Sequence, residues 1–462
     1  MKVSISDTPK HLTHIVYISE EEKQRVPDFS GKKNEVHVIY DNKKAIIYCG
    51  IGEKKNITDA VIRNSTAYAI QKALELKREE VSVLIFWDNK KTYWKEALEG
   101  CILGSYKFTK YKTEKEPTIT SINLVGKNIN NKEVEKKQFI CECVNFARDI
   151  VNENAHVANP QYIAQIAKEI AKTSKLKIEI LDEKQIAKKG LRLIEAVGAA
   201  SHFPPRLVLI EYKGNPSSKE KIAIVGKGIT FDSGGLNLKP TGHIETMRSD
   251  MAGAAAVLGT IKAIGKIKPR INIVGVCPLV HNAIGKKAYF PGDVYKSYSG
   301  KTVEIGCTDA EGRLILADAI SYCKDKYKPT TIIDLATLTG GILVCFGNVA
   351  AGLFSNNDNL AEKLLVASKA TDEKLWQLPI YEELAETIKS DIADINNVSK
   401  LKKGYASSIT GAAFIKEFVG DIPWAHLDIA GTAFNEDKPK GIIPQFATGF
   451  GVRLLLNFCG AE

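Results

Sequence analysis

A short apolar run that leads directly into a glycine-rich segment constrains the fold of this chain most. Residues 222–225 contain no polar side chain, which is typical of a strand covered on both faces of a sheet. The next residues, 226–239, hold four glycines, two lysines and an aspartate, a composition suited to a backbone that approaches something closely. From Tyr162 onward, helical and strand patterns alternate. The sequence therefore predicts an α/β layer in which helices cover a sheet.

The length of 462 residues leaves room for two domains with cores that need no disulfide. We expect a small N-terminal α/β domain over residues 1–130, a linker helix over 131–152 and a second, larger domain over 153–462. Within the first domain the patterns predict four elements: a hairpin of residues 35–40 and 44–49, a helix at 58–76 and a strand at 82–87. A loop is expected near residues 401–408.

Composition argues for a cytoplasmic location. The nine cysteines are an odd number without a Cys-x-x-Cys pair, which favours reduced thiols, and no apolar segment follows the N-terminus as in a secretory signal. The apolar stretch 332–354 is interrupted by Asp334 and several glycines, so we expect a buried strand, loop and strand and no membrane span. The net charge of +10 is diffuse, which favours a solvated surface over a nucleic-acid site.

Residues 307–314 read Cys-Thr-Asp-Ala-Glu-Gly-Arg-Leu and gather two carboxylates and a guanidinium. They lie between a β-rich run, 302–305, and a helical run, 314–323. Such junctions often carry chemistry in α/β proteins. The alternative is a capped helix start, because acidic residues in a first turn complement the helix dipole.

A helix predicted at 244–264 places Met247 and Asp250 on one face, and its small residues at 252–256 allow close packing on the sheet. A carboxylate on a face that packs inward is costly unless a cation meets it, so Asp250 points to a metal or a lysine. A phosphate loop is not supported, since neither Gly-x-x-x-x-Gly-Lys nor Gly-x-Gly-x-x-Gly occurs here. Without a His-Glu-x-x-His motif, a metal site must be mainly oxygen-ligated.

Several segments together resemble the leucyl aminopeptidase family of di-metal exopeptidases, also called cytosol aminopeptidases. The resemblance runs from near Ala147 to the C-terminus. It rests on residues 307–314, 226–235, 247–251, 290–293, 336–340 and 424–431, which occur in the family's order.

The resemblance implies roles for seven residues. Two divalent ions, Zn²⁺ and/or Mn²⁺ with Mg²⁺ or Co²⁺ as alternatives, would be held by Lys227, Asp232, Asp250, Asp309 and Glu311, with Asp232 and Glu311 bridging. Lys227 would be a neutral ligand, because two nearby cations depress its pKa. A hydroxide activated by both metals would attack, while Lys239 polarises the scissile carbonyl. Arg313 would hold bicarbonate as the general base.

The resemblance also implies specificity, fold and assembly. Substrates would be peptides and dipeptides with a free N-terminal amine, and the first side chain, Leu-like, would meet Met247, Thr337, Leu338, Gly340 and Ala447. Simple core packing is the alternative for Met247 and Ala447. The larger domain would be an α/β catalytic domain with a central mixed sheet covered by helices, assembled as a homohexamer from two trimers.

Three positions depart from the family pattern: Cys307 replaces an asparagine, His281 a glutamate, and Gln445-Phe446 a Lys-Gly pair. Cys307 puts the preference for the second substrate residue in doubt and is itself either a packed thiol or an adventitious metal ligand. A second hypothesis is a DNA-binding accessory protein, since some relatives of the family bind DNA, but its only support is the net charge. A catalytically inactive relative is not favoured, because every expected catalytic residue is present.

Overall fold

The computed structural model describes residues 1–88, 91–401 and 404–461. Contacts divide the chain into two compact units. Unit 1 comprises Met1–Asn145 with Asn435–Thr448, and unit 2 comprises Phe146–Phe434 with Gly449–Glu462. The boundary at Asn145 falls inside α3 (Asn131–Asn152), the helix expected at 131–152. The domain limits proposed from the sequence stay predictions.

Unit 1 is built on a six-stranded sheet with the order β1-β6-β5-β2-β4-β3, in which every pairing is parallel except that of β3 with β4. Its strands are β1 (Lys2–Ser6), β2 (Thr13–Ile18), β3 (Val36–Asp41), β4 (Lys44–Gly50), β5 (Glu80–Leu84) and β6 (Ser121–Val125). Its helices are η1 (Glu20–Arg25), η2 (Lys54–Asn56), α1 (Asp59–Glu75) and α2 (Trp94–Gly104).

Local sequence signals place several of these elements. The predicted hairpin is confirmed as β3 and β4, and Asn42 takes the left-handed conformation (φ 52°) that its turn requires. The helix predicted at 58–76 is confirmed as α1. The side chain of Thr58 caps the start of α1 by accepting a hydrogen bond from the amide of Val61. The strand predicted at 82–87 is only partly right. It ends at Leu84, since Trp87 bridges instead to Thr92.

Unit 2 contains most of the remaining elements. Its strands are β7 (Lys177–Leu181), β8 (Arg206–Lys213), β9 (Ile222–Gly226), β10 (Gly228–Asp232), β11 (Asn272–Asn282), β12 (Val294–Lys296), β13 (Thr302–Glu304), β14 (Thr331–Ala336), β15 (Ala351–Ser355), β16 (Leu375–Gln377), β17 (Ile395–Asn396) and β18 (Trp424–Asp428). Its helices are α4 (Pro160–Ser174), α5 (Glu183–Lys189), α6 (Arg192–Gly198), η3 (Met247–Met251), α7 (Ala252–Ile267), α8 (Gly312–Tyr327), α9 (Gly340–Phe346), α10 (Asp358–Thr371), α11 (Glu382–Ala385), η4 (Glu386–Ile388), α12 (Ser407–Val419) and α13 (Val452–Phe458). The short strands β19 (Phe434–Asn435) and β20 (Phe446–Ala447) lie near the end of the chain.

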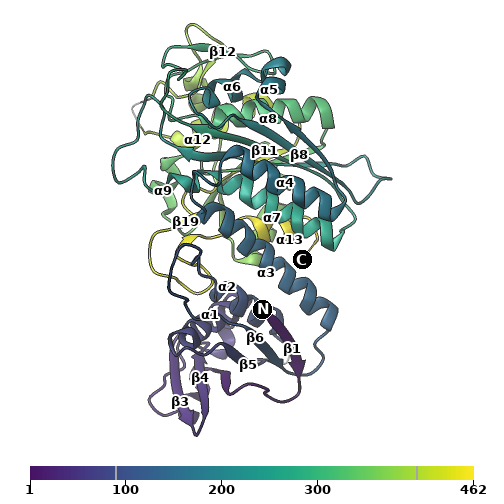
Figure 1. The fold of residues 1–462 in the computed structure, drawn as a ribbon, viewed down its shortest axis with the longest axis vertical. Helices are drawn as coiled ribbons and strands as arrows, with labels where there is room; N and C mark the ends of the chain where they lie inside the picture. The colour runs from purple at the N-terminus through teal and green to yellow at the C-terminus, as the bar shows by residue number, and fades with distance from the viewer. Residues whose placement is uncertain (89–90, 402–403, 462) are drawn as a thin grey trace. The chain divides into compact units, whose positions relative to one another are not determined.

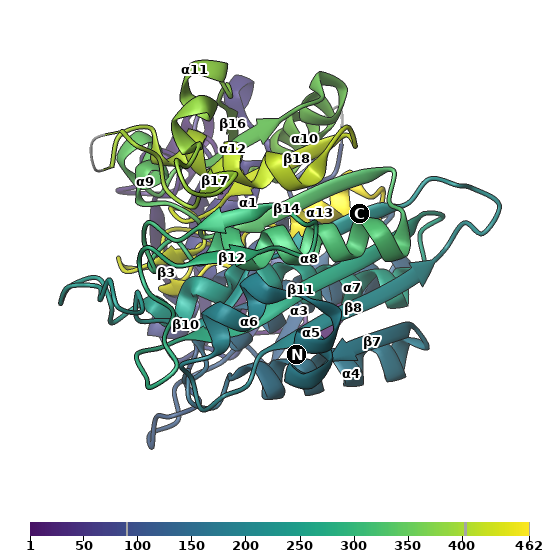
Figure 2. The ribbon, with the colours of Figure 1, turned by 90° about the horizontal axis from the view of Figure 1, so that it is seen from above.

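The main sheet of unit 2 is mixed, as expected. Its order is β16-β15-β18-β14-β9-β11-β8-β7, with β10 added beside β11, and Figure 2 shows the succession from β7 to β16. β9 pairs in parallel with both of its neighbours, β11 and β14. In contrast, β8 runs antiparallel to β11, and β15 runs antiparallel to β18. In Figure 1, α5, α6 and α8 lie on one side of β8 and β11, and α4, α7 and α13 lie on the other. Helices therefore cover both faces, which explains why the central strands are apolar.

Close packing at the sheet explains the glycines of the first motif. A Cβ atom on Gly226 would lie 2.3 Å from the carbonyl oxygen of Gly253, and one on Gly253 would lie 2.2 Å from that of Leu335. The small residues at the start of α7 thus let its backbone approach β9 and β14, as predicted.

Within the glycine-rich segment, Gly228–Asp232 forms β10 beside β11. Two sequence predictions need correction. The helix predicted at 244–264 starts as the 3₁₀ helix η3 and becomes α-helical only at Ala252. Met247 and Asp250 still share a face, since i and i+3 eclipse in a 3₁₀ helix. The apolar stretch 332–354 forms a strand, a helix (α9) and a strand.

Two further predictions concern a membrane span and the loop at residues 401–408. Among the described residues, no helix combines the length and the apolar character that crossing a bilayer demands. Of the loop expected at 401–408, residues 402 and 403 lie outside the described residues, and α12 begins at Ser407.

Candidate metal centre

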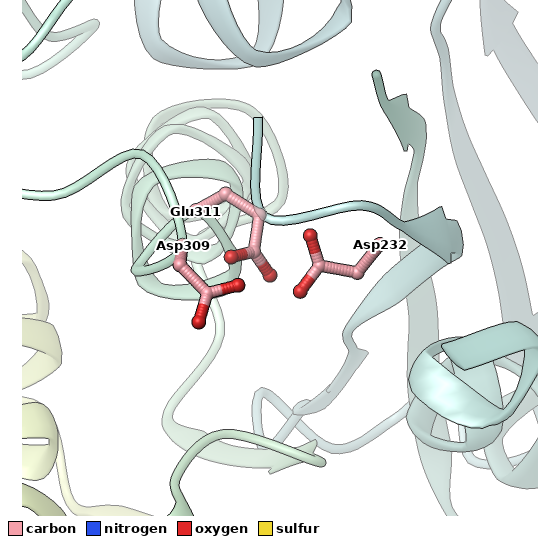
Figure 3. A group of neighbouring side chains, drawn as sticks. All are labelled: Asp232, Asp309 and Glu311. Carbon is pink, nitrogen blue, oxygen red and sulfur yellow. The ribbon is translucent and has the colours of Figure 1, made fainter. Parts of the chain in front are cut away.

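Three carboxylates meet where β10 ends and α8 begins. Asp232 is the last residue of β10, and Asp309 and Glu311 occupy the turn before Gly312, the first residue of α8. One oxygen from each of the three lies within 4.8 Å of the others, and Figure 3 shows the side chains pointing toward one another. The Asp232 and Glu311 side chains are 2% and 1% exposed, whereas that of Asp309 is 34% exposed. Two buried carboxylates and one accessible carboxylate therefore share one small volume.

Two lysines lie among these carboxylates. The Nζ of Lys227 lies 2.8 Å from Asp250 and 2.9 Å from Glu311. The Nζ of Lys239 lies 2.9 Å from Asp232 and 2.6 Å from Asp309. Each lysine thus joins two of the four acidic residues. The sequence predictions placed these six side chains in one site, and the structure brings them together.

The backbone of Lys227 is held where β9 passes into β10. Its amide donates to the carbonyl of Leu335 at 2.9 Å, and its carbonyl accepts from the amide of Ala254 at 2.8 Å. A Cβ atom on Gly312 would lie 2.4 Å from Cε of Lys227, so the side chain crosses the start of α8 only because that position is glycine. The glycine of the 307–314 motif therefore makes room for the lysine of the upstream motif.

Charges at the site are unbalanced, because four carboxylates face only two lysines. Burial, together with the neighbouring Asp232 and Glu311, raises the pKa of Asp309 to about 7. Burial also raises the pKa of Asp250. Burial alone would lower the pKa of Lys227 and Lys239, but the surrounding carboxylates outweigh it and raise both. The centre thus has an excess of negative charge.

The donor atoms fit divalent cations. The Oδ2 of Asp250, the Oδ1 of Asp309 and both Oε atoms of Glu311 are buried without a directed hydrogen bond, although lysine Nζ atoms lie at ion-pair distance from three of them. Buried oxygens of this kind are costly unless a cation meets them, and oxygen-rich sets suit Mg²⁺ and Mn²⁺, with Zn²⁺ also accepting carboxylates. Without bound cations, the surrounding carboxylates raise the pKa of Lys227. The neutral Lys227 implied by the resemblance concerns the metal-loaded site and stays a prediction.

Asparagine and threonine side chains hold the carboxylate-bearing segments. The Nδ2 of Asn282 donates to Oδ1 of Asp232 at 2.8 Å and to the carbonyl of Thr308 at 3.1 Å. Thr308 and Asn237 exchange hydrogen bonds of 2.8 Å in both directions. Sequence reasoning gave Asn282 no role, because its partners Asp232 and Thr308 are far from it along the chain.

Arg313 is buried in the first turn of α8. Its Nη1 donates to the carbonyl of Asn397 at 2.8 Å, while its Nε lacks a hydrogen-bond partner among the described residues. Burial lowers the pKa of this guanidinium. A buried N–H without a partner, beside the amino end of a helix, fits a small anion such as bicarbonate.

Asn397 also braces the 307–314 motif. Its Oδ1 accepts from the amides of Gly306 and Cys307, and its Nδ2 donates to the carbonyls of Cys307 and Ala310. No sequence signal identified Asn397, because it is far from the motif along the chain.

The five residues predicted to bind the substrate side chain lie in different surroundings, and their binding role stays a prediction. The Oγ1 of Thr337 donates to Oδ1 of Asp250 at 2.7 Å and its carbonyl accepts from Lys227, so Thr337 is part of the charged centre. The amide of Leu338 donates to Asp428, and Met247 is half-buried at the start of η3. A Cβ atom on Gly340 would meet nothing within 4 Å, which leaves open space there. Ala447 is buried in unit 1.

Cys307 is half-buried, and its thiol is not one of the three grouped ligands among the described residues. Burial raises the pKa of this thiol. Its backbone is held on both sides by Asn397.

Comparison with known proteins points to one family. Residues 145–456 match the catalytic domain of the cytosol aminopeptidase family, and residues 21–115 match the N-terminal domain of that family. A probable cytosol aminopeptidase of Protochlamydia amoebophila is 40% identical over 445 residues, covering 93% of this chain and 88% of that protein. A protein of the same name from Chlamydia caviae is 40% identical over 447 residues, covering 93% and 89%. The bottromycin maturation enzyme BotP in complex with Mn has a TM-score of 0.89 at 28% identity, covering 98% of this chain and all of that one.

Proposed function

Because the chain belongs to the cytosol aminopeptidase family, we propose that it is a metal-dependent aminopeptidase that removes N-terminal residues, Leu-like ones preferred, from peptides and dipeptides. The observation that carries this proposal is the meeting of Asp232, Asp309 and Glu311 within 4.8 Å, joined by two lysines. The manganese complex of BotP supports a divalent metal by similarity.

The chain's own residues divide the metal-binding task. Asp232, Asp309 and Glu311 would supply most of the oxygen ligands, with Asp250 and Lys227 on the buried side. Two bound divalent ions would activate a water molecule and polarise the scissile carbonyl at neutral pH. Asn282 would keep the Asp232 carboxylate in place through its 2.8 Å hydrogen bond.

Two cationic side chains would act on the reacting groups. Lys239 is partly accessible and remains protonated, because the surrounding carboxylates raise its pKa, so it can stabilise negative charge that develops on the carbonyl oxygen. Arg313 would orient bicarbonate through its unpaired Nε, and that anion would accept the proton from the attacking water. Asp250 would attract the free α-amine of the substrate, so we expect the enzyme to need an unblocked N-terminus.

The open space at Gly340, with Leu338 and Met247, is the candidate position for the first side chain of the substrate. A DNA-binding accessory role is not favoured, because it rests only on a diffuse net charge. A homohexamer and a cytoplasmic location remain proposals.

Hydrolysis of Leu-p-nitroanilide and Leu-Gly after loading with Mn²⁺, Zn²⁺ or Co²⁺ tests the proposal. We expect turnover that chelation abolishes and no turnover of N-acetyl-Leu-p-nitroanilide, which lacks the free amine. Asp309→Ala should lose activity and metal together, whereas Asp391→Asn should keep both, since Asp391 is an exposed surface partner of Lys400. The proposal fails if the loaded protein is inactive or if Asp309→Ala is as active as the parent.

A further inference from the structure

A cavity lies in unit 1, and none of the residues of the candidate metal centre line it. Its volume is about 570 Å³, within the range of about 300–1,000 Å³ that is usual for small-molecule sites. Its walls come from three segments at or after the ends of strands: residues 16–25, which include the end of β2, residues 54–57 after β4, and residues 84–88, which start at the last residue of β5. The cavity is therefore at the carboxyl ends of parallel strands.

The order of the strands marks this place as a ligand site. Beside β2 lie β4 on one side and β5 on the other. From β2 the chain continues toward β3 and β4, whereas from β5 it continues through α2 to β6 on the opposite side. The two connections diverge between β2 and β5. In open α/β sheets, this point of divergence at the carboxyl ends is where ligands bind.

One wall of the cavity is aromatic. Tyr17 and Phe86 pack edge to face at 6.2 Å, and Phe86 also contacts Tyr93. Next to them Trp87 is 67% exposed, although the backbone bridge to Thr92 holds its position in the chain. The backbone of Trp87 is held in place while its indole ring is exposed, and such a ring can stack with another planar ring.

Two cationic side chains, Arg25 and Lys54, also line the cavity. Arg25 and Lys54 both face Glu22, with distances of 3.1 and 3.4 Å to the same Oε1. The Oε2 of Glu22 accepts from the hydroxyl of Ser19, so one carboxylate serves two cations and a hydroxyl. The Arg25 and Lys54 side chains are 66% and 53% exposed. Both side chains can therefore bind an anion without a change in the fold.

The remaining acidic side chain at the cavity has a local role. The Oδ1 of Asp88 accepts from the amide of Lys91, and its Oδ2 accepts from the hydroxyl of Tyr93. These bonds tie down the turn that carries Trp87.

We propose that this cavity binds a mononucleotide, with the base on Trp87 and the phosphate at Arg25 and Lys54. The aromatic wall, the two exposed cations beside Glu22 and the position between β2 and β5 fit a ligand that joins a planar ring to an anionic group. A site of this kind goes beyond peptide hydrolysis and does not depend on it.

Isothermal titration of the full-length chain with AMP tests the proposal. Adenosine, which has the ring alone, and inorganic phosphate, which has the anion alone, should each bind much more weakly than AMP. Trp87→Ala should weaken AMP binding about tenfold or more, the usual effect of losing one stacked base. Arg25→Gln with Lys54→Gln should weaken it further and flatten its dependence on salt.

Matched controls separate the site from general surface effects. Trp376→Ala removes a tryptophan of similar exposure, 65%, in unit 2. Lys55→Gln removes a lysine next to Lys54 in the chain, and Lys55 does not line the cavity. Both should bind AMP like the parent, and all variants should keep the parent's thermal unfolding midpoint. The proposal is overturned if AMP does not bind, if Trp87→Ala binds it as tightly as the parent does, or if phenylalanine binds more tightly than AMP.

Discussion

The Nζ of Lys227 lies 2.8 Å from both carboxylate oxygens of Asp250, and both side chains are buried. The same Nζ reaches Glu311 at 2.9 Å, so a residue from the end of β9 links η3 to the start of α8. Without metal, Lys227 therefore offsets the negative charge of Asp250 and Glu311. It lies where we propose that it binds a metal ion.

Replacing Lys227 tests this double role. Lys227→Met should lower the thermal unfolding midpoint of the metal-free protein, because removing one partner of a buried ion pair costs about 3–5 kcal/mol. The variant should also retain less Mn²⁺ after dialysis, measured by elemental analysis. A variant with full metal content and an unchanged midpoint would contradict both roles.

Lys239 should behave differently. Lys239→Met removes a group that contacts Asp232 and Asp309 but that we assign to the carbonyl oxygen of the substrate. We expect kcat for Leu-p-nitroanilide to fall about 10²–10³-fold, the usual loss for one oxyanion donor, while the metal content stays near that of the parent. A proportional loss of metal and activity would assign Lys239 to the metal instead.

Arg313 should determine the dependence on bicarbonate. In the parent, kcat should rise when bicarbonate is added to carbonate-free buffer, because the buried Nε of Arg313 has no hydrogen-bond partner among the described residues. Arg313→Met should lower kcat and abolish the response. If Arg313→Met responds to bicarbonate as the parent does, the anion binds elsewhere.

Metal affinity should rise with pH. The pKa of Asp309 in the metal-free protein is raised to about 7, so this carboxyl is protonated in much of the protein at pH 6 and ionised at pH 8. Metal must displace that proton, so Mn²⁺ should bind more tightly at pH 8 than at pH 6 and should release more protons from Asp309 at pH 6 than at pH 8. Calorimetry in buffers of different ionisation enthalpy measures the release. Equal affinity at both pH values would count against this account.

A buried ion pair elsewhere in unit 2 predicts a pH-dependent stability. The Nδ1 of His426 lies 2.6 Å from Oδ1 of Asp334, and neither side chain is exposed. Burial lowers the pKa of His426, but the charge and hydrogen bond of Asp334 outweigh it and raise the net value. A raised histidine pKa adds stability that is fully present below the unfolded value of about 6.5 and is lost as pH rises through the folded value.

Asp334→Asn should therefore lower the unfolding midpoint more at pH 6 than at pH 9. The indole of Trp424, which donates to Oδ2 of Asp334 at 2.7 Å, can still donate to the asparagine oxygen, so the difference reports the charge. Asp391→Asn, on the surface, should shift the midpoint equally at both pH values. A shift in Asp334→Asn that does not change with pH would show that His426 is neutral.

Local patterns in the sequence predicted much of the fold and the identity of the charged residues. The apolar run at 222–225 and the cap at Thr58 act over a few residues, so their elements, β9 and α1, could be predicted from neighbours in the chain. The six acidic and basic residues that meet at the centre were also identified from motifs, although only the resemblance suggested their roles.

The tertiary structure alone decided what surrounds them. Asn397 supports a motif from which it is separated by 90 positions at Cys307, and Thr337 contacts Asp250 across 87 positions. Trp87 lies outside the strand predicted to contain it and pairs with Thr92. These contacts have no periodic signal, because they depend on which loops the folded sheet brings together and not on the local conformation of each loop. The sequence by itself determined which charges this protein carries to the end of β10, and the packing of α7 and α8 on the sheet determined which of those charges face one another.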